Sequence, residues 1–451
     1  MGTLWQDIRY GLRMLARSPG FAVVAVLILA LGIGANTVFF SIINGILLRP
    51  LSFDNPDELV QLNQKDPTRG ETSVSSGAFI QWREHNTVFE HTAAYSAHDF
   101  TLTGSGGAEI VKAACVTGDF FRILGIQPLM GRQFCPEDED VSTGYTAILS
   151  CGLWQRRFGS DPNVIGKMLT VEGLGMTIVG VLPRDFSYPL LKGADLWVPR
   201  TLTVNDYGSH WLQVIARLKD GMTIEQADVE MDGIARQISR EFPEGNKGLT
   251  EVSTYALQEK VVGDLDKYLY AVFGAAASVL LVACANVAGL LLARLPGRQK
   301  ELTVRMVLGV GSEHVARQLL TESILLAALA GGLGFVWSIF GIQLARACIP
   351  GNVPLIENIR IDGRVLGFNI AASVFTGLLF GMAPALQVGK STFMESLKGQ
   401  TTRVAGGARN YRFRAGLIAC EIALATVLLT GSVPMARSLI RPPRDSDPIT
   451  C

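Results

Sequence analysis

Five stretches of the chain are long and apolar enough to cross a lipid bilayer, and they limit the possible folds more than any other feature. They are residues 21–48, 268–293, 319–345, 365–389 and 415–436. A helix needs about 20 mostly apolar residues to cross about 30 Å of hydrocarbon. Within the five stretches the only charged residues are Glu322 and Glu421, while Arg or Lys flanks most of them. Buried helices of a soluble protein would not need this bracketing, so the sequence predicts a helical membrane protein.

The charges of the chain are divided unequally between two parts. Residues 49–267 contain twenty Lys/Arg and thirty Asp/Glu, whereas the remainder contains twenty and ten. Residues 1–20, 294–318 and 390–414 together hold fourteen basic and four acidic residues. Basic loops stay in the cytoplasm. We therefore expect these three segments inside, and residues 49–267 and the short loop 346–364 outside.

The first twenty residues have the pattern of a helix that lies on a membrane surface. Apolar residues recur at helical spacing with basic residues on one flank, namely Leu4, Ile8, Leu12 and Leu15 beside Arg9, Arg13 and Arg17. This pattern predicts an amphipathic helix on the cytoplasmic leaflet. A solvated extension of the first span remains the alternative.

The segment 49–267 mixes strand and helix signals. Residues 168–171 and 176–182 read as a hairpin, because both are apolar and a Gly-containing turn separates them. Thr223 and Gln226 form a capping box that begins an amphipathic helix, and Pro243 ends it. The predicted fold class is therefore an α-helical transmembrane bundle of about five spans, with a large α+β extracytoplasmic domain between spans 1 and 2.

This segment shows no arrangement typical of catalysis or metal binding. Its four histidines are irregularly spaced, and the acidic run 137–140 lacks the alternating ligands and Gly of a calcium loop. We expect a solvated turn there. Cys115, Cys135 and Cys151 are an odd number, which leaves one disulfide open. The sequence predicts neither an enzyme nor a metal site.

Residues 388–392 resemble the end of a phosphate-binding loop, but that motif requires Gly at position 384, which is Pro384. A membrane span also precedes these residues in place of the strand that the motif needs. We therefore expect this chain to bind no cofactor, and no nucleotide of its own.

Polar residues within spans usually face a helix bundle. The candidates are Asn36, Asn286, Glu322 and Glu421. We expect Asn36 and Asn286 to form hydrogen bonds between helices. The two glutamates lie near the inner ends of their spans. For them we favour the alternative that their side chains extend to the membrane interface.

The loop 294–318 predicts a short helix over residues 299–308, because helix-forming residues there end at Gly309 and Gly311, and Ser312 can cap the following span. A short helix parallel to the membrane, between two spans, is a shape that can dock into a cleft on a soluble partner.

Several motifs make the chain similar to the MacB/FtsX class of ABC-transporter permeases, and particularly to the acidobacterial duplicated orphan permeases. They include WQDIRYGLRMLARSPGFAVVAVLILALGIGANTVFF, VTGDFFRILGIQPLMGRQF, HWLQVIARLKDGMTIEQADVEMDGIARQI, KELTVRMVLGVGSEHVARQLLTES and TGLLFGMAPALQ. The resemblance implies one span, a two-lobed exported domain and three further spans. It also implies that the loop 294–318 contacts a separate ATPase over residues 298–309. There the helical spacing predicts Leu302 and Met306 as an apolar anchor, flanked by the charges of Arg298, Glu301 and Arg305. That these charges only enforce the topology is the alternative.

Residues 415–436 resemble the start of a second copy of this unit, and the tail 437–451 departs from it, which suggests a truncated member. The resemblance implies a permease subunit of an ATP-driven exporter in the inner membrane, with ATP bound by a separate ABC ATPase. It also implies that the permease is dimeric or pseudo-dimeric and that it binds no nucleic acid. Whether a periplasmic adaptor takes part stays open. The alternative is an FtsX-like transmitter that regulates an envelope enzyme without transport.

Overall fold

The computed structural model describes residues 2–66, 70–104, 107–246, 248–263, 265–307, 312–348, 355, 359–395 and 419. The chain divides into two compact units. We call Met1–Leu48 with Asp264–Cys451 the helical unit, and Arg49–Gly263 the inserted unit. The division lies close to the expected boundaries at 49 and 267.

The helical unit contains five helices in its described part, of which four are long and apolar enough to cross a membrane. The helices are α1 (Gly2–Arg17), α2 (Pro19–Ile43), α9 (Leu265–Val307), α10 (Ser312–Cys348) and α11 (Gly363–Glu395), and a π-helical turn, Asn44–Leu48, extends α2. The spanning parts are Pro19–Leu48, Leu265–Arg294, His314–Ala347 and Gly363–Met382. These four agree with the first four predicted spans, and the predicted span 415–436 lies outside the described residues.

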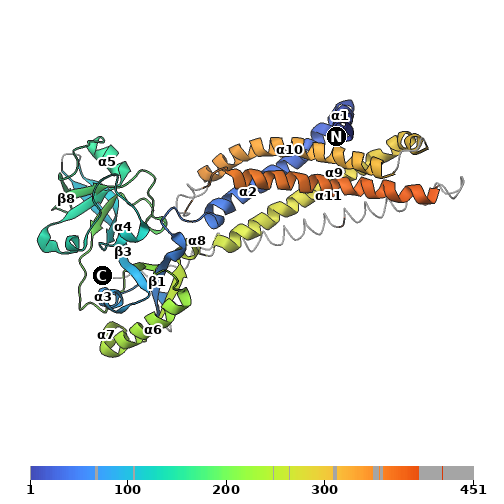
Figure 1. Ribbon diagram of the computed structural model, residues 1–451. Coiled ribbons are helices and arrows are strands. Elements are labelled where there is room, and N and C mark those ends of the chain that lie inside the picture. The colour runs from blue at the N-terminus through green and yellow to red at the C-terminus, as the bar shows by residue number, and fades with distance from the viewer. Residues whose placement is uncertain are drawn as a thin grey trace. The chain divides into compact units, whose positions relative to one another are not determined.

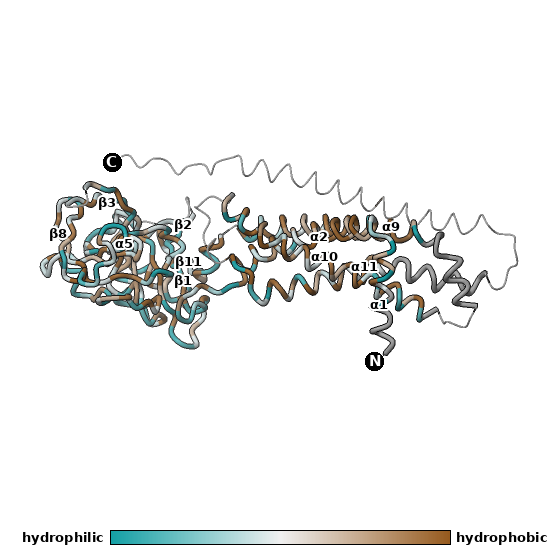
Figure 2. The backbone as a smooth tube through the Cα atoms, turned by 90° about the horizontal axis from the view of Figure 1, so that it is seen from above, coloured by the Kyte–Doolittle hydropathy of each residue, from teal (hydrophilic) through white to brown (hydrophobic). Residues whose placement is uncertain are grey.

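Helices α2, α9, α10 and α11 run lengthwise beside one another (Figure 1). Apolar residues, brown in Figure 2, occur along the length of these four helices. Their shared core contains Leu29, Ile33, Val287 and Phe380, all fully buried or nearly so. Apolar side chains therefore make the contacts within the bundle and also cover its outer surface.

Two glycines allow α2 and α10 to touch backbone to backbone. A Cβ atom on Gly34 would lie 2.9 Å from the carbonyl oxygen of Gly334, and one on Gly334 would lie 2.8 Å from that of Ala30. Small residues permit such close approach in lipid, where van der Waals packing holds helices together.

The amphipathic segment forms helix α1, which ends at Arg17 and is separated from α2 by Ser18. Pro19 causes this break, because the residue before a proline is pushed away from helical backbone angles. Ser18 accordingly has φ −137° and ψ 65°. Of the apolar residues whose side chains are described, Leu12 is exposed and Leu15 packs on the bundle core.

The described residues of the inserted unit form one mixed sheet of eleven strands. They are β1 (Leu59–Asp66), β2 (Gly70–Thr72), β3 (Phe89–Thr103), β4 (Glu109–Val116), β5 (Met130–Gly131), β6 (Thr146–Leu149), β7 (Met168–Val171), β8 (Leu174–Val181), β9 (Leu196–Pro199), β10 (Gln213–Leu218) and β11 (Glu251–Ala256). The order along the sheet is β11-β1-β10-β3-β4-β9-β6-β8-β5, with β2 on β1, and with β7 on β3 and β8.

Among the described residues, six α-helices accompany the sheet: α3 (Ser76–His85), α4 (Phe120–Leu124), α5 (Cys151–Phe158), α6 (Ile224–Glu241), α7 (Pro243–Asn246) and α8 (Leu257–Val262). One hydrophobic core lies among β1, β10, α3 and α6, and a second among β4, β6, β8 and α5. The 15-residue strand β3 contributes to both cores.

The predictions of a hairpin and of a capped amphipathic helix in this unit are confirmed. The hairpin of β7 and β8 forms with Glu172 and Gly173 as a two-residue turn. Thr223 and Gln226 make a reciprocal capping box at the start of α6, as the sequence indicated. The observed fold class therefore agrees with the predicted one: apolar spans with a large mixed domain between the first and second.

Candidate functional site

The predicted docking residues lie on α9. Arg298, Glu301, Leu302, Arg305 and Met306 all belong to its helical backbone, and their side chains lie outside the described part of the structure. Positions 302 and 306 are one turn apart and therefore share one face.

The structure corrects one expectation about this segment. It is not a separate short helix, because α9 continues without a break for 43 residues from Leu265 to Val307. Pro296 removes one backbone hydrogen bond, but the residues after it are mostly strong helix formers such as Arg, Gln, Lys, Glu and Leu. The second span and the docking segment are thus one element.

Arg294 ties α9 to the junction between α1 and α2. Its guanidinium donates a hydrogen bond to Ser18 Oγ at 2.8 Å and lies 4.0 Å from the centre of the Phe21 ring. Such a cation–π contact adds about 0.5–2 kcal/mol. Arg294 stands one turn before Arg298. The contacts of Arg294 with Ser18 and Phe21, which we call the clamp, therefore lie next in sequence to the predicted docking segment, residues 298–306. Sequence analysis missed the clamp, although an Arg ending one span and a Ser-Pro pair beginning another were visible.

Glu322 is buried beside this clamp. Its side chain, together with Leu15, Ser18, Arg294 and Ser323, lines a cavity of about 30 Å³, and the residue is 8% exposed. A cavity of this size can hold a water molecule. Helix α1 covers Glu322, because a Cβ on Gly11 would lie 3.7 Å from Glu322 Cγ. That Glu322 lies at the membrane interface stays a prediction. Glu421 lies outside the described residues.

The two asparagines occupy different environments. Asn36 is buried, and its Nδ2 donates to the carbonyl oxygen of Gly32 at 2.9 Å and to that of Ala276, on α9, at 2.8 Å. Asn286 is exposed on the surface of the described bundle. The expectation of a bond between helices therefore does not hold for Asn286 among the described residues, because it lies one position away from the buried face marked by Val287.

A further row of polar contacts joins α2 to the start of α11, and sequence analysis missed it. Asn369 Nδ2 donates to Thr37 Oγ1 at 3.0 Å, and Asn44 Nδ2 donates to Asp362 Oδ2 at 2.9 Å. The spacing of residues 37, 41 and 44 along one helix face was the available signal. These bonds fix the register of two otherwise apolar helices.

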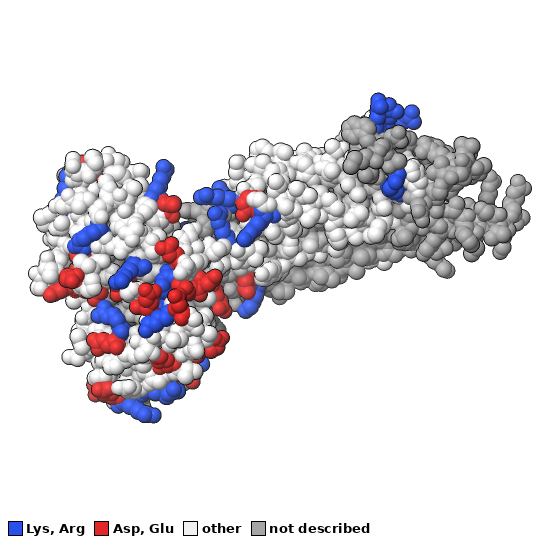
Figure 3. Space-filling model, in the orientation of Figure 1, with Lys and Arg blue, Asp and Glu red and all other residues white. Residues whose placement is uncertain are grey.

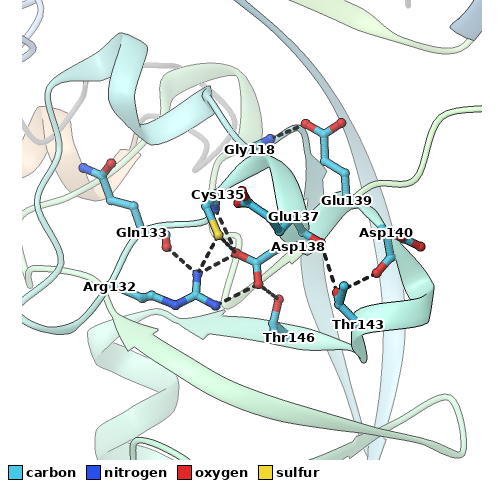
Figure 4. A network of polar contacts seen from close by, with 10 residues as sticks. All are labelled: Gly118, Arg132, Gln133, Cys135, Glu137, Asp138, Glu139, Asp140, Thr143 and Thr146. Carbon is cyan, nitrogen blue, oxygen red and sulfur yellow. Dashed lines mark hydrogen bonds and ion pairs between the residues drawn. The ribbon is translucent and has the colours of Figure 1, made fainter.

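The acidic run of the inserted unit is partly structural, which corrects its interpretation as a solvated turn (Figure 4). Asp138 is buried, and the guanidinium of Arg132 donates to its two oxygens at 2.6 and 2.8 Å. The backbone N–H of Cys135 donates to Asp138 as well, at 2.8 Å. Glu139 accepts a bond from Gly118 N–H. The run thus folds back on its own neighbours.

Burial alone would raise the pKa of Asp138, but the bonds from Arg132 and Cys135 outweigh it and lower the pKa to about 2. The carboxylate is therefore ionised at neutral pH and holds a local turn. Cys115, Cys135 and Cys151 are free thiols. In the described part of the chain, no three His, Cys, Asp or Glu residues are close enough together to hold a metal.

Charged side chains are scattered in both signs over the visible face of the inserted unit, whereas the described helices are almost free of them there (Figure 3). This difference is what a lipid-facing bundle and a water-facing domain require.

Comparisons with known proteins agree with this division. The protein family described as the MacB-like periplasmic core domain matches residues 22–234. The family described as the FtsX-like permease C-terminal matches residues 273–393. The macrolide export ATP-binding/permease protein MacB of Salmonella typhi is 26% identical over 280 residues, which are 61% of this chain and 41% of that protein. MacB of Campylobacter jejuni is 24% identical over 330 residues, 71% of this chain and 50% of its own length.

The chain thus spans about half, or less, of the length of these relatives. Among solved structures, the periplasmic region of MacB from Actinobacillus actinomycetemcomitans aligns over 50% of this chain and 95% of its own, with 12% identity and a TM-score of 0.35. The extracellular domain of the transporter YknZ aligns over 44% and 99%, with 14% identity and a TM-score of 0.32. From the two family matches and the four spans, the chain is a membrane protein of the MacB/FtsX permease type, with a MacB-like extracytoplasmic domain followed by an FtsX-like permease domain.

Proposed function

We propose that this chain is the permease subunit of an ATP-driven export system and that it works by transmitting movement. A separate ATPase binds and hydrolyses ATP in the cytoplasm and docks on residues 298–306. Its closure displaces the docking segment, and the inserted unit, exposed outside the inner membrane, moves substrate outward. Relatives of this chain are macrolide export proteins, which suggests a hydrophobic or peptide-like cargo.

The observation that carries this proposal is the continuity of α9. A helix of 43 residues is about 65 Å long at 1.5 Å per residue. Its first residues follow the inserted unit directly in the chain, and its last residues are the docking segment. A displacement applied at one end of a continuous helix reaches the other without crossing a flexible joint.

Two contacts support the transfer of that movement to α2, the other connection to the inserted unit. Asn36 bonds α2 to α9 near the middle of the span, and Arg294 bonds α9 to the start of α2. Both spans that lead into the inserted unit are therefore linked, and they move together.

The docking face is tested by introducing two negative charges on one face of the helix. Leu302→Asp with Met306→Asp should abolish co-purification of the ATPase, because two unpaired carboxylates would be buried in its cleft. Val304→Asp with Val307→Asp is the matched control, since it adds the same charge on the opposite face. Equal ATPase recovery with both double variants would refute the assigned face.

Export and signalling require different readouts. With the ATPase co-reconstituted in vesicles, an exporter moves a macrolide probe only when ATP is present. A transmitter of the FtsX kind would instead couple ATP hydrolysis to an envelope hydrolase without moving the probe. ATP hydrolysis that the chain does not alter would contradict both functions.

A further inference from the structure

The first and last segments of the inserted unit pack together into one region, which we call the root: residues 49–58 and 257–263. The Gln258 side-chain amide donates to the carbonyl oxygen of Arg49 at 3.3 Å. Leu51 and Leu257 are buried, and α8 packs on β1 and on the turn Pro56–Glu58. Any displacement of the two chain ends of this unit is therefore applied to the root.

Arg217, on the central strand β10, holds the root to the sheet. Its side chain is 9% exposed, and it donates to the carboxylate of Glu58 at 2.8 Å. It also donates to the carbonyl oxygens of Asp54 at 2.6 Å, Asn55 at 3.3 Å and Ile123 at 3.2 Å. The rigid guanidinium fork thus bridges three segments that are far apart in sequence.

The contact between the root and α4 is close as well as hydrogen-bonded. Gly125 ends α4 with φ +69°, and a Cβ there would lie only 2.7 Å or less from three atoms of the Asp54 side chain. The N–H of Asp54 donates to the carbonyl oxygen of Leu124 at 3.4 Å. Only glycine leaves room for this approach.

Helix α4 in turn packs on β3 and on β10. Phe120 and Phe121 are fully buried. The Phe120 ring centre lies 5.8 Å from that of Tyr95, on β3, and 5.5 Å from that of Trp197, on β9. Because β3 contributes to both cores, a force on α4 reaches each of them through dense packing.

We propose that Arg217 is a positioning residue that makes the root and both cores of the inserted unit one rigid body, so that movement of the chain ends displaces the whole unit. The inference rests on the proposed function for its purpose, but its geometry is independent of it. Buried ion pairs add little net stability, whereas a fixed fork sets orientation. Arg217 touches neither cargo nor ATPase in this scheme.

Distances between spin labels in the intact protein test whether Arg217 joins the root rigidly to the two cores. Labels at Ser52 in the root, at Val229 near the first core and at Asn163 near the second, all exposed, give two root distances and one reference distance between the cores. Noncanonical labelled residues avoid the native cysteines. Arg217→Gln should broaden both root distributions and leave the Val229–Asn163 distribution as narrow as in the wild type.

Arg157→Gln is the matched control. Arg157 has a side chain 8% exposed, donates to the carbonyl oxygens of Thr103 and Gly107, and pairs with Glu109, but it does not touch the root. This variant should leave the root distributions unchanged. Arg217→Lys keeps the charge beside Glu58 without the fork, and it should broaden the root distributions to a smaller extent than Arg217→Gln.

Two outcomes of the distance measurement overturn the proposal. Root distributions as narrow in Arg217→Gln as in the wild type would show that the fork is not the joint. A reference distribution broadened as much as the root distributions, in Arg217→Gln and Arg217→Lys alike, would show that Arg217 holds the entire fold.

The functional arm separates this inference from the proposed function. With the ATPase present, Arg217→Gln should keep ATP hydrolysis at the wild-type rate and lose export of the macrolide probe. Wild-type protein without ATP-dependent activity would contradict the proposed function alone and leave the distance result standing. Full export by Arg217→Gln would contradict the joint alone.

Discussion

At the scale of single residues, Asp138 links pH to the stability of the inserted unit. Its folded pKa of about 2 lies below the ordinary value of 3.8. A carboxyl group with a depressed pKa stabilises the fold above its unfolded pKa, and this contribution disappears as the pH falls from about 4 to about 2. Asp138→Asn should lower the unfolding free energy at pH 7 by about 1–2 kcal/mol, allowing for the half-exposed Arg132.

Denaturant unfolding followed by tryptophan fluorescence measures this effect, because four of the six tryptophans lie in the inserted unit. The difference between Asp138→Asn and the wild type should shrink at pH 2.5. Asp140→Asn is the control, since Asp140 is exposed and only caps the N–H of Ser142. An equal loss of stability in both variants would show that the position of the charge is unimportant.

Asn36 and Asn286 form a second residue-scale pair, in which burial decides the result. Asn36→Leu removes the bond to Ala276 and should destabilise the bundle by about 0.6–1.7 kcal/mol, the range found for polar contacts between spans. Asn286→Leu places an apolar side chain on an exposed face and should change the stability little. Thermal unfolding in detergent compares the two, and the reverse ranking would contradict the placement of Asn36.

At the scale of elements, the Gly34–Gly334 contact sets the distance between α2 and α10. Gly34→Ala places a methyl group 2.9 Å from the carbonyl oxygen of Gly334, so the helices must separate, at a cost of about 1–3 kcal/mol. Gly332→Ala, on α10 two residues before Gly334, is the control, because no atom lies within 4 Å of its Cβ. A melting temperature lowered by Gly332→Ala but not by Gly34→Ala would contradict the observed crossing.

The elements also show what a sequence can predict. The α6 capping box, the β7–β8 hairpin and four spans depend on neighbours in the chain, and all were predictable. The position of β1 between β10 and β11 depends on residues about 150 or more positions apart, for which no local signal exists. The same holds for Arg217, whose partners come from other segments. The continuity of α9 through Pro296 and Gly297 was not predictable from local signals, because both residues ordinarily weaken or interrupt a helix.

At the scale of the whole molecule, the proposed orientation is testable by labelling. On a cysteine-free background, Thr203→Cys should react with an impermeant maleimide from outside the inner membrane. Ala16→Cys, on α1, should react only after that membrane is permeabilised, because the proposed orientation places the basic segments in the cytoplasm. Both positions are exposed in the structure. The opposite pattern would reverse the topology.

The packing of residues 49–58 against 257–263 has a consequence for how such a chain diversifies. A domain whose termini are neighbours can be inserted or removed without forcing its host apart. The inserted unit therefore behaves as a cassette, and another domain with adjacent termini could replace it while α2 and α9 keep their present paths. Exchange of such domains would let one helical unit carry inserted domains with many different binding surfaces.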